Sequence, residues 1–389
     1  MSVRWKRPAA VVAAVAVAEA AALLLRPRGG PADPAPVNAE SYFSAAEIDR
    51  AREFRRPQLG LFGGMLAVQG AVLGAFVRRP PRVGPAACGA ALSTALSVAP
   101  LPLAAVSRRR AVNVGLVTQS WGGWAGDVGK SLAIGAVEGA AAGAGAAALV
   151  RRLPRTWWLA GSAAAVAVGA AFAYAGPVLL APLFNRFTDL PAGPVRDDVV
   201  ALAELAGVDV GRILEVDGSR RTTMANAYVT GLGHTKRVVL YDTLLRDFTR
   251  AETRLVVAHE LAHVRHRDVP RFLLYLALVA PPVAYAVSQL VGPSPSLPAL
   301  LAGSVAVTAP IGLVGNGMSR AIERRCDAEA VAATGDAESF VAFHRNIALK
   351  NLADPDPPRW QQILLGTHPT TVERIALALA ATGRSPEGS

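Results

Sequence analysis

Residues 256–266 read VVAHELAHVRH, and the interpretation of the whole chain begins with this stretch. It contains the pattern H-E-x-x-H at His259, Glu260 and His263. Residues four apart on a helix lie about 40° apart in projection, so both imidazoles can reach one metal ion. Glu260 lies about 100° around from His259, close enough to contact a water on that ion. The alternative is a pair of surface histidines beside a solvated glutamate, but the apolar residues before His259 favour a buried helix.

The composition is typical of a membrane protein. The chain has 389 residues, of which 52% are hydrophobic. Seven apolar stretches reach or approach the roughly 20 residues that a helix needs to cross a bilayer. They are residues 9–25, 59–77, 83–106, 131–150, 157–184, 272–291 and 297–314. The first stretch also resembles a secretory signal peptide, although the six later stretches and the closing Arg26 and Arg28 favour a retained anchor.

Positive charges gather where the apolar stretches end. The net charge is +11, and three of the clusters are Arg78/Arg79/Arg82, Arg108–Arg110 and Arg151/Arg152/Arg155. Arginines at span ends serve as interfacial anchors and topology signals. The charge therefore predicts contact with a lipid bilayer and no nucleic-acid partner.

The chain divides near residue 186. Residues 1–186 are predicted to form an N-terminal membrane domain of five spans. Residues 187–389 are predicted to form a small α+β domain, interrupted by a transmembrane hairpin at 272–314. Within this second domain, strands are expected at 213–216, 227–229 and 238–241. Helices are expected at 197–208, 252–265, 319–334, 336–352 and 371–381.

The hairpin determines which parts of the chain share a side of the membrane. Two spans separate residue 272 from residue 314, so the chain before and after them lies on one side. The link between the two spans, residues 292–296, carries no charge and therefore suits the outside. We expect a multi-pass protein of the cell membrane whose catalytic side faces the cytoplasm.

A catalytic zinc ion needs a third protein ligand besides the two histidines. Glu323, in the stretch SRAIERRCDAEA, is the best candidate because the hairpin returns it to the side of His259. Asp327 lies four residues later on the same helix face. It could accept a hydrogen bond from the second nitrogen of a ligand histidine, which orients the ring. The alternative is an ordinary acidic helix that pairs with its own arginines.

Four separated blocks carry a resemblance to a known family. They are GLVTQSWGGWAGDVGK (115–130), ANAYVTGLGHTKRVVLYDTLL (225–245), the HELAH pattern itself, and SRAIERRCDAEA (319–330) followed by THPTTVERI (367–375). Together with five spans before the catalytic part and two after it, they resemble the membrane-embedded zinc metallopeptidases of the CAAX prenyl endopeptidase family, which are of the gluzincin type. The resemblance covers most of the chain.

The resemblance implies the composition of the active site. One Zn²⁺ would be held by His259, His263 and Glu323, and Glu260 would act as the general base toward a water that the metal activates. The family fold implied is a multi-pass α-helical membrane protein of about seven spans with a small α+β, gluzincin-like zinc peptidase domain.

The resemblance also implies how a substrate binds. Asn226, Ala227 and Tyr228 resemble the family's edge strand, to which a substrate backbone adds as an extra strand. His368 resembles the family's histidine near the developing oxyanion. The alternatives are an ordinary hairpin strand and a surface histidine.

These observations predict a zinc-dependent integral membrane endopeptidase acting on a peptide or protein substrate, for which a prenylated C-terminus is one option. A membrane quality-control metalloprotease is the first alternative. A non-catalytic, metal-binding membrane sensor is the second, and it is less well supported because a purely structural site would use a fourth ligand in place of Glu260.

Overall fold

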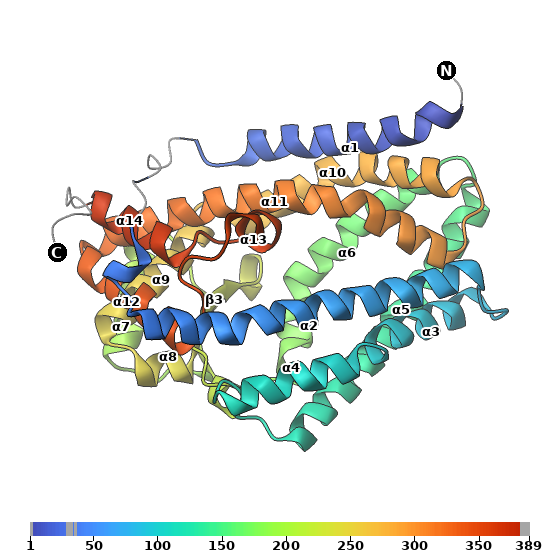
Figure 1. Cartoon of the computed structure of the whole chain (residues 1–389). Coiled ribbons are helices and arrows are strands. Elements are labelled where there is room, and N and C mark those ends of the chain that lie inside the picture. The colour runs from blue at the N-terminus through green and yellow to red at the C-terminus, as the bar shows by residue number, and fades with distance from the viewer. Residues whose placement is uncertain (1–2, 29–33, 35–36, 382–389) are drawn as a thin grey trace.

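The computed structural model describes residues 3–28, 34 and 37–381 (Figure 1). Residues 382–389, at the end of the predicted second domain, and residues 1–2 lie outside this part. Within it, seven spans are long and apolar enough to cross a membrane, as predicted. The helices that form them are α1 (Val3–Leu25), α2 (Ala45–Arg78), α3 (Pro85–Val98) with α4 (Leu101–Asn113), α5 (Trp121–Arg152), α6 (Trp157–Leu179), α10 (Asp268–Val291) and α11 (Leu297–Thr334).

Residues 83–106 are expected to form one continuous span. In the structure the third span is interrupted. It consists of α3 and α4, which meet at Ala99 and Pro100. Pro100 and the nearby Pro102 have no backbone N–H to donate, and a proline ring clashes with the preceding turn of a helix. The span is therefore broken at this point.

Glycines allow α3 and α5 to pack closely. A Cβ atom added to Gly89 on α3 would lie 1.9 Å from the carbonyl oxygen of Gly139 on α5, and one added to Gly143 would lie 2.2 Å from the carbonyl oxygen of Pro85. Small residues at such positions let helix backbones approach within the membrane. This part of the membrane domain depends on the absence of side chains at these glycines.

The longest helix of the described residues joins a membrane span to the polar C-terminal part of the chain. The span expected at 297–314 and the polar helix expected at 319–334 are one helix, α11, of 38 residues. At 1.5 Å per residue it is about 57 Å long. The intervening Gly315 and Gly317 lower helix propensity but do not end the helix, which stops at Gly335 with φ 66°. Residues of its second half are therefore held rigidly relative to the bilayer.

The sheet has four strands in the order β1-β2-β4-β3. They are β1 (Phe187–Asp189), β2 (Arg212–Val216), β3 (Ala227–Thr230) and β4 (Arg237–Tyr241). The three predicted strands are confirmed, while the three-residue β1 was too short to be recognised. Among the described residues β3 pairs with β4 alone, in antiparallel register, so its other side is a free sheet edge there.

Helices surround this sheet and complete the domain. They are α7 (Pro194–Ala206), α8 (Asp242–Asp247), α9 (Arg250–Arg265), α12 (Ala337–Lys350), α13 (Arg359–Leu365) and α14 (Thr371–Ala381), with the 3-10 turns η3 (Gly218–Arg220) and η4 (Gly233–Thr235). Two further 3-10 turns, η1 (Ala39–Ser41) and η2 (Ala181–Leu183), lie earlier in the chain. The main core lies between the sheet and α7, α9 and α12, and includes Leu202, Leu240, Leu255 and Phe340. The short α8 and α13 were not predicted because six or seven residues show little periodicity.

Ion pairs fasten α8 to α12. Asp247 at the end of α8 bonds to Arg246 and to Lys350 at the end of α12. Hydrogen bonds from Arg246 and Lys350 lower the pKa of Asp247 to about 2.

Candidate metal centre and active site

Helix α9 presents the two histidines of the HELAH pattern. It begins with a capping box in which Thr249 and Glu252 bond to each other's backbone N–H groups. The face that carries Val257, Ala258 and Leu261 is buried in the core. His259 and His263 lie on another face of the helix and remain partly accessible. The buried face therefore anchors the helix, and both imidazoles lie on its more accessible side.

Three side-chain donors converge beside α9. The Nε2 atoms of His259 and His263 lie 3.3 Å apart, and the carboxylate of Glu323 on α11 lies 3.3 Å from the first and 3.5 Å from the second. Bonds of about 2.0–2.1 Å in tetrahedral geometry place ligand atoms about 3.3–3.4 Å apart. The three donors therefore fit three corners of a zinc tetrahedron and leave the fourth corner open.

Each histidine has a carboxylate behind it. His259 Nδ1 lies 2.9 Å from Asp327 Oδ1, and His263 Nδ1 lies 3.0 Å from Asp268 Oδ2. Such partners fix the tautomer, so that the Nε2 lone pair faces the metal. Burial lowers the pKa of His259, but the hydrogen bonds of Asp327 and Glu323 outweigh it and raise that pKa to about 10. The neighbouring carboxylates thus favour a positive charge at this position, which a bound cation also supplies.

Asp268 was missed in the sequence. It lies at the start of α10, five residues after His263, and is buried. Arg325 on α11 bonds to Asp268 Oδ2, and Arg271 lies 2.8 Å from its Oδ1. The sequence does show an acidic residue soon after the motif helix. Its contact with His263, however, depends on the turn between α9 and α10.

Glu260 faces the edge strand. Its Oε2 atom accepts a hydrogen bond of 3.1 Å from the backbone N–H of Val229. Burial raises the pKa of Glu260 above its usual value. A buried carboxylate with a raised pKa next to a metal position is well suited to accept and release a proton.

His368 and Arg374 approach Glu323 from the C-terminal part of the chain. His368 Nε2 lies 3.5 Å from Glu323 Oε2, while the His368 side chain remains exposed. Arg374 Nη2 donates to Glu323 Oε2 at 3.0 Å, and its Nε lies 3.3 Å from Asp327 Oδ2. Arg374 was not singled out in the sequence, although it lies in the block THPTTVERI. One guanidinium therefore holds both Glu323 and Asp327 in place.

The edge strand offers alternate residues to a substrate. The carbonyl of Asn226 accepts from Tyr241 N–H on β4, so the backbone groups of Ala227 and Val229 point to the free edge. Tyr228, one of the three expected substrate-binding residues, instead turns its backbone toward β4. Its ring contacts Tyr241 at a centroid distance of 6.3 Å. Asn226 and Ala227 line the cavity next to His259.

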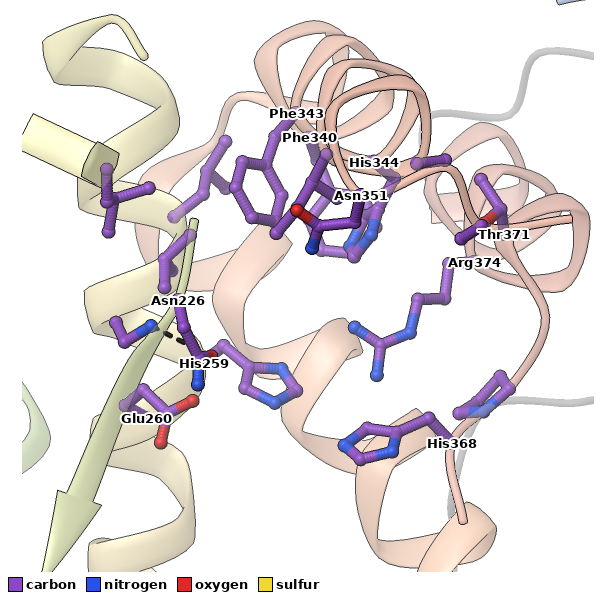
Figure 2. A pocket seen from close by; sticks show the side chains of 18 residues that line it. Asn226, His259, Glu260, Phe340, Phe343, His344, Asn351, His368, Thr371 and Arg374 are labelled. Atoms are coloured by element: carbon purple, nitrogen blue, oxygen red, sulfur yellow. Dashed lines mark hydrogen bonds between the residues drawn. The ribbon is translucent and has the colours of Figure 1, made fainter. Parts of the chain in front are cut away.

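This cavity has a volume of about 420 Å³ (Figure 2). His259, Glu260, His368 and Arg374 form part of its wall. Apolar side chains of α9 and α12 form much of the rest. Of the histidines away from the candidate metal centre, His234 is exposed. His344 is buried and lines this cavity.

Residues 190–382 match the model of peptidase family M48. This part of the chain belongs to peptidase family M48. The match begins just after β1 and includes every residue of the candidate metal centre.

Similar proteins agree with this family. An uncharacterized metalloprotease, YhfN of Bacillus subtilis, is 28% identical over 243 residues, which are 58% of this chain and 57% of that protein. CAAX prenyl protease 1 of Saccharomyces cerevisiae is 37% identical over 103 residues, 26% of this chain and 23% of that protein. Its Arabidopsis thaliana homolog is 46% identical over 88 residues, 22% and 21% of the two chains. The chain thus spans little more than half of the first relative and under a quarter of the other two.

The crystal structure of Ste24p from S. mikatae has the same fold. It superposes with a TM-score of 0.73 at 19% sequence identity, over 95% of this chain and 97% of that one. The expected fold, a multi-pass helical membrane protein with a small α+β peptidase domain, is therefore confirmed. So is the resemblance to the CAAX protease family.

Proposed function

We propose that this chain is a zinc-dependent integral membrane endopeptidase that hydrolyses internal peptide bonds of peptide or protein substrates. The observation that carries the proposal is the tetrahedral spacing of the His259, His263 and Glu323 donors beside Glu260 and a free strand edge. Two imidazoles and one carboxylate are a ligand set of catalytic zinc sites, in which the fourth position serves the reaction.

A bound zinc ion would supply a Lewis acid that makes water nucleophilic near neutral pH and polarises a peptide carbonyl. Glu260 accepts the proton of the attacking water and delivers it to the amine nitrogen as the C–N bond breaks. Asp327 and Asp268 keep His259 and His263 in the tautomer that binds metal.

His368 lines the cavity, and Figure 2 shows His259 between Glu260 and His368. An imidazole N–H at this place is suited to donate to the oxygen on which negative charge develops. Arg374 holds Glu323 in place through its 3.0 Å hydrogen bond. His368 therefore stabilises the negative charge of the transition state, and Arg374 positions the metal ligand Glu323.

The substrate would add to β3 as an extra strand. The outward backbone groups of Ala227 and Val229 provide the main-chain partners. Val229 N–H donates to Glu260 in the structure, so a substrate carbonyl that takes this hydrogen bond would release the Glu260 carboxylate for proton transfer. Asn226 Oδ1 accepts from the outward N–H of Ala227 at 3.0 Å, and Tyr228 turns its backbone toward β4.

We further propose that the protein resides in the cell membrane with the peptidase domain, residues 187–389, in the cytoplasm and the membrane domain at 1–186. The uncharged link between α10 and α11 supports this orientation. Prenylated C-terminal peptides are included among the proposed substrates because the relatives from yeast and Arabidopsis are named CAAX prenyl proteases.

The test uses the full-length protein purified in detergent. It is assayed on a farnesylated CAAX peptide, the unprenylated twin and an unfolded membrane protein. We expect cleavage that a chelator abolishes and zinc restores. Glu260→Gln should reduce kcat by about 100-fold or more. The matched control is Glu338→Gln, the same chemical change at an exposed glutamate of α12.

The outcomes separate the parts of the proposal. No zinc-dependent cleavage of any substrate, or an undiminished Glu260→Gln variant, would disprove the peptidase. Equal cleavage of both peptides would leave an endopeptidase without selectivity for the prenyl group. Cleavage of the unfolded protein alone would favour a quality-control protease.

A further inference from the structure

A second cavity lies between the end of the membrane span α6 and the sheet. Its volume is about 320 Å³. Apolar residues of α6 and η2 form one part of its wall, and Tyr228, Thr230 and Arg237 of the sheet form another. Arg237 is the charged residue of this wall, which contains no carboxylate within the described part of the chain. The proposed peptidase mechanism uses neither this cavity nor Arg237.

The cavity lies behind the edge strand, on the face of the sheet that is turned away from α9. Thr230 and Arg237 are directly opposite each other on β3 and β4, so their side chains share one face. Tyr228 has the same face because side chains alternate along a strand. Ala227, on the opposite face, packs in the main core with residues of α9. The cavity is therefore separate from the one that His259 lines.

Arg237 is a buried cation without a negative partner. Only 9% of the residue is exposed. Its Nη1 donates to the carbonyl oxygen of Pro177 at 3.2 Å, while its Nε is buried and has no hydrogen-bond partner. Arg237 forms no ion pair within the described part of the chain. One neutral carbonyl does not balance a buried charge, so the cavity favours an anionic occupant.

The apolar wall of the cavity continues along the membrane span. Helix α6 has 23 residues and is about 34 Å long, close to the roughly 30 Å of the hydrocarbon core, so its last turns lie near the membrane surface. Four residues at intervals of four share one side of this end of the helix, namely Val168, Phe172, Gly176 and Leu180.

This side of α6 is open. Val168 is 54% exposed and Phe172 is 46% exposed. A Cβ atom added to Gly176 would have no atom within 4 Å. An unfilled apolar track therefore leads from the cavity toward the centre of the bilayer.

The occupant must combine an anionic head with an apolar tail. A guanidinium binds phosphate oxygens through charge-assisted hydrogen bonds. Burial raises the pKa of Tyr228 to about 12, so its hydroxyl is neutral and can donate as well. The ammonium group of a zwitterionic lipid would find no carboxylate in this wall. Basic pockets beside membrane spans are suited to lipids with a net negative charge.

We propose that this cavity binds an anionic phospholipid, whose phosphate pairs with Arg237 and whose acyl chain follows Phe172 and Val168 along α6. The lipid contacts Tyr228 and Thr230 and so supports the edge strand β3 from behind. This site goes beyond the proposed peptidase function and does not depend on it, because its tests measure binding and not cleavage.

The first experiment compares three probes on the full-length protein, freed of lipid in detergent. They are a short-chain phosphatidylglycerol, phosphatidylcholine of the same chain length, and inorganic phosphate. A ligand that binds the folded state raises the temperature of unfolding. We expect a saturable rise with phosphatidylglycerol and none with the other two at the same concentrations. A general effect of lipid on the micelle would appear with both lipids.

The second experiment removes the charge. Arg237→Gln should increase the phosphatidylglycerol concentration that gives half of the full rise by about 10-fold or more, because a charge-assisted hydrogen bond is lost. The matched control is Arg186→Gln, the same chemical change at an exposed arginine just before β1, and it should leave this concentration unchanged.

The third experiment fills the apolar track and leaves Arg237 in place. Gly176→Leu should weaken phosphatidylglycerol binding by about 10-fold, because the new side chain takes the space of the acyl chain. Leucine is also a better helix former than glycine, so the variant should fold. The matched control is Gly161→Leu on the same helix, where an added Cβ likewise has no atom within 4 Å. This pair decides the matter if Arg237→Gln shows no cooperative unfolding.

The outcomes are distinct. An equal rise with phosphatidylcholine would overturn the requirement for a net negative charge. An equal rise with inorganic phosphate would leave a site for a free anion and overturn the lipid. A folded Arg237→Gln or Gly176→Leu variant that binds phosphatidylglycerol as tightly as the original protein would overturn the site. None of these results bears on zinc-dependent cleavage, which stands or falls by its own assay.

Discussion

Replacement of Asp327 by asparagine tests whether the buried carboxylates hold the metal ligands in place. Asp327 is fully buried, and its two oxygens lie 2.9 Å from His259 Nδ1 and 3.3 Å from Arg374 Nε. Asparagine has nearly the same shape, so packing is preserved. Its amide nitrogen, however, is a donor, so only one of the two contacts keeps an acceptor, and the negative charge is lost.

The expected size of the effect follows from this geometry. Loss of a partner behind a ligand histidine lowers metal affinity about 10–100-fold, which is about 1.4–2.7 kcal/mol of binding free energy. We expect the upper half of this range, because charge interactions are strongest where water is excluded and Asp327 has no access to solvent.

The assay is competition for zinc with a chromophoric chelator at neutral pH, which requires no knowledge of a substrate. The matched control is Asp209→Asn, at an exposed position of the turn between α7 and β2, and its zinc Kd should stay unchanged. A folded Asp327→Asn protein whose zinc Kd lies within twofold of the original would refute the reasoning that Asp327 orients His259.

Three further predictions concern stability and topology. Gly89→Ala should lower the free energy of unfolding by about 1–3 kcal/mol, because its Cβ would lie 1.9 Å from a backbone oxygen of α5. Gly145→Ala, whose Cβ would have no atom within 4 Å, should not lower it. Thermal unfolding in detergent compares the two variants, and an equal loss of stability in both would contradict the close packing of α3 and α5. The pKa of Asp247 is about 2 in the folded protein and about 4 when unfolded, so its stabilisation is present above pH 4 and lost as the pH falls toward 2. Asp247→Asn should therefore lower the free energy of unfolding by about 1 kcal/mol at pH 7 and by progressively less below pH 4. A difference in unfolding free energy between the variant and the original protein that does not change with pH would contradict the charge interaction. Ser294→Cys, in the exposed α10–α11 link, should react with a membrane-impermeant thiol reagent added to intact cells, and labelling only after lysis would reverse the proposed orientation.

The membrane part illustrates what hydropathy can and cannot predict. Seven spans were predictable because the length and apolar character of each are local properties. The break between α3 and α4 was visible only as Pro100 and Pro102. The continuity of α11 was not predictable from the sequence. Glycines between an apolar and a polar segment weaken a helix without ending it, so the packing of α11 against its neighbours decides whether the helix continues.

The active site shows the same division at the level of single residues. His259, Glu260 and His263 were predictable because one helical turn relates them. Glu323 and Asp327 required the further argument that a hairpin returns the chain to the same side. Asp268 and Arg374 were missed, because their roles arise from the turn after α9 and from the docking of α14 on α11.

The sequence by itself determined the motif helix, the spans and the candidate ligands, since each depends on periodicity or spacing along the chain. Only the tertiary structure decided the 3.3–3.5 Å convergence of three donors, the free edge of β3 and the placement of His344 in the cavity wall. The position of Glu323 beside the histidines and the cavity wall depend on contacts between segments more than 50 residues apart. The energy of such contacts comes from packing in three dimensions, which no local pattern in the chain encodes.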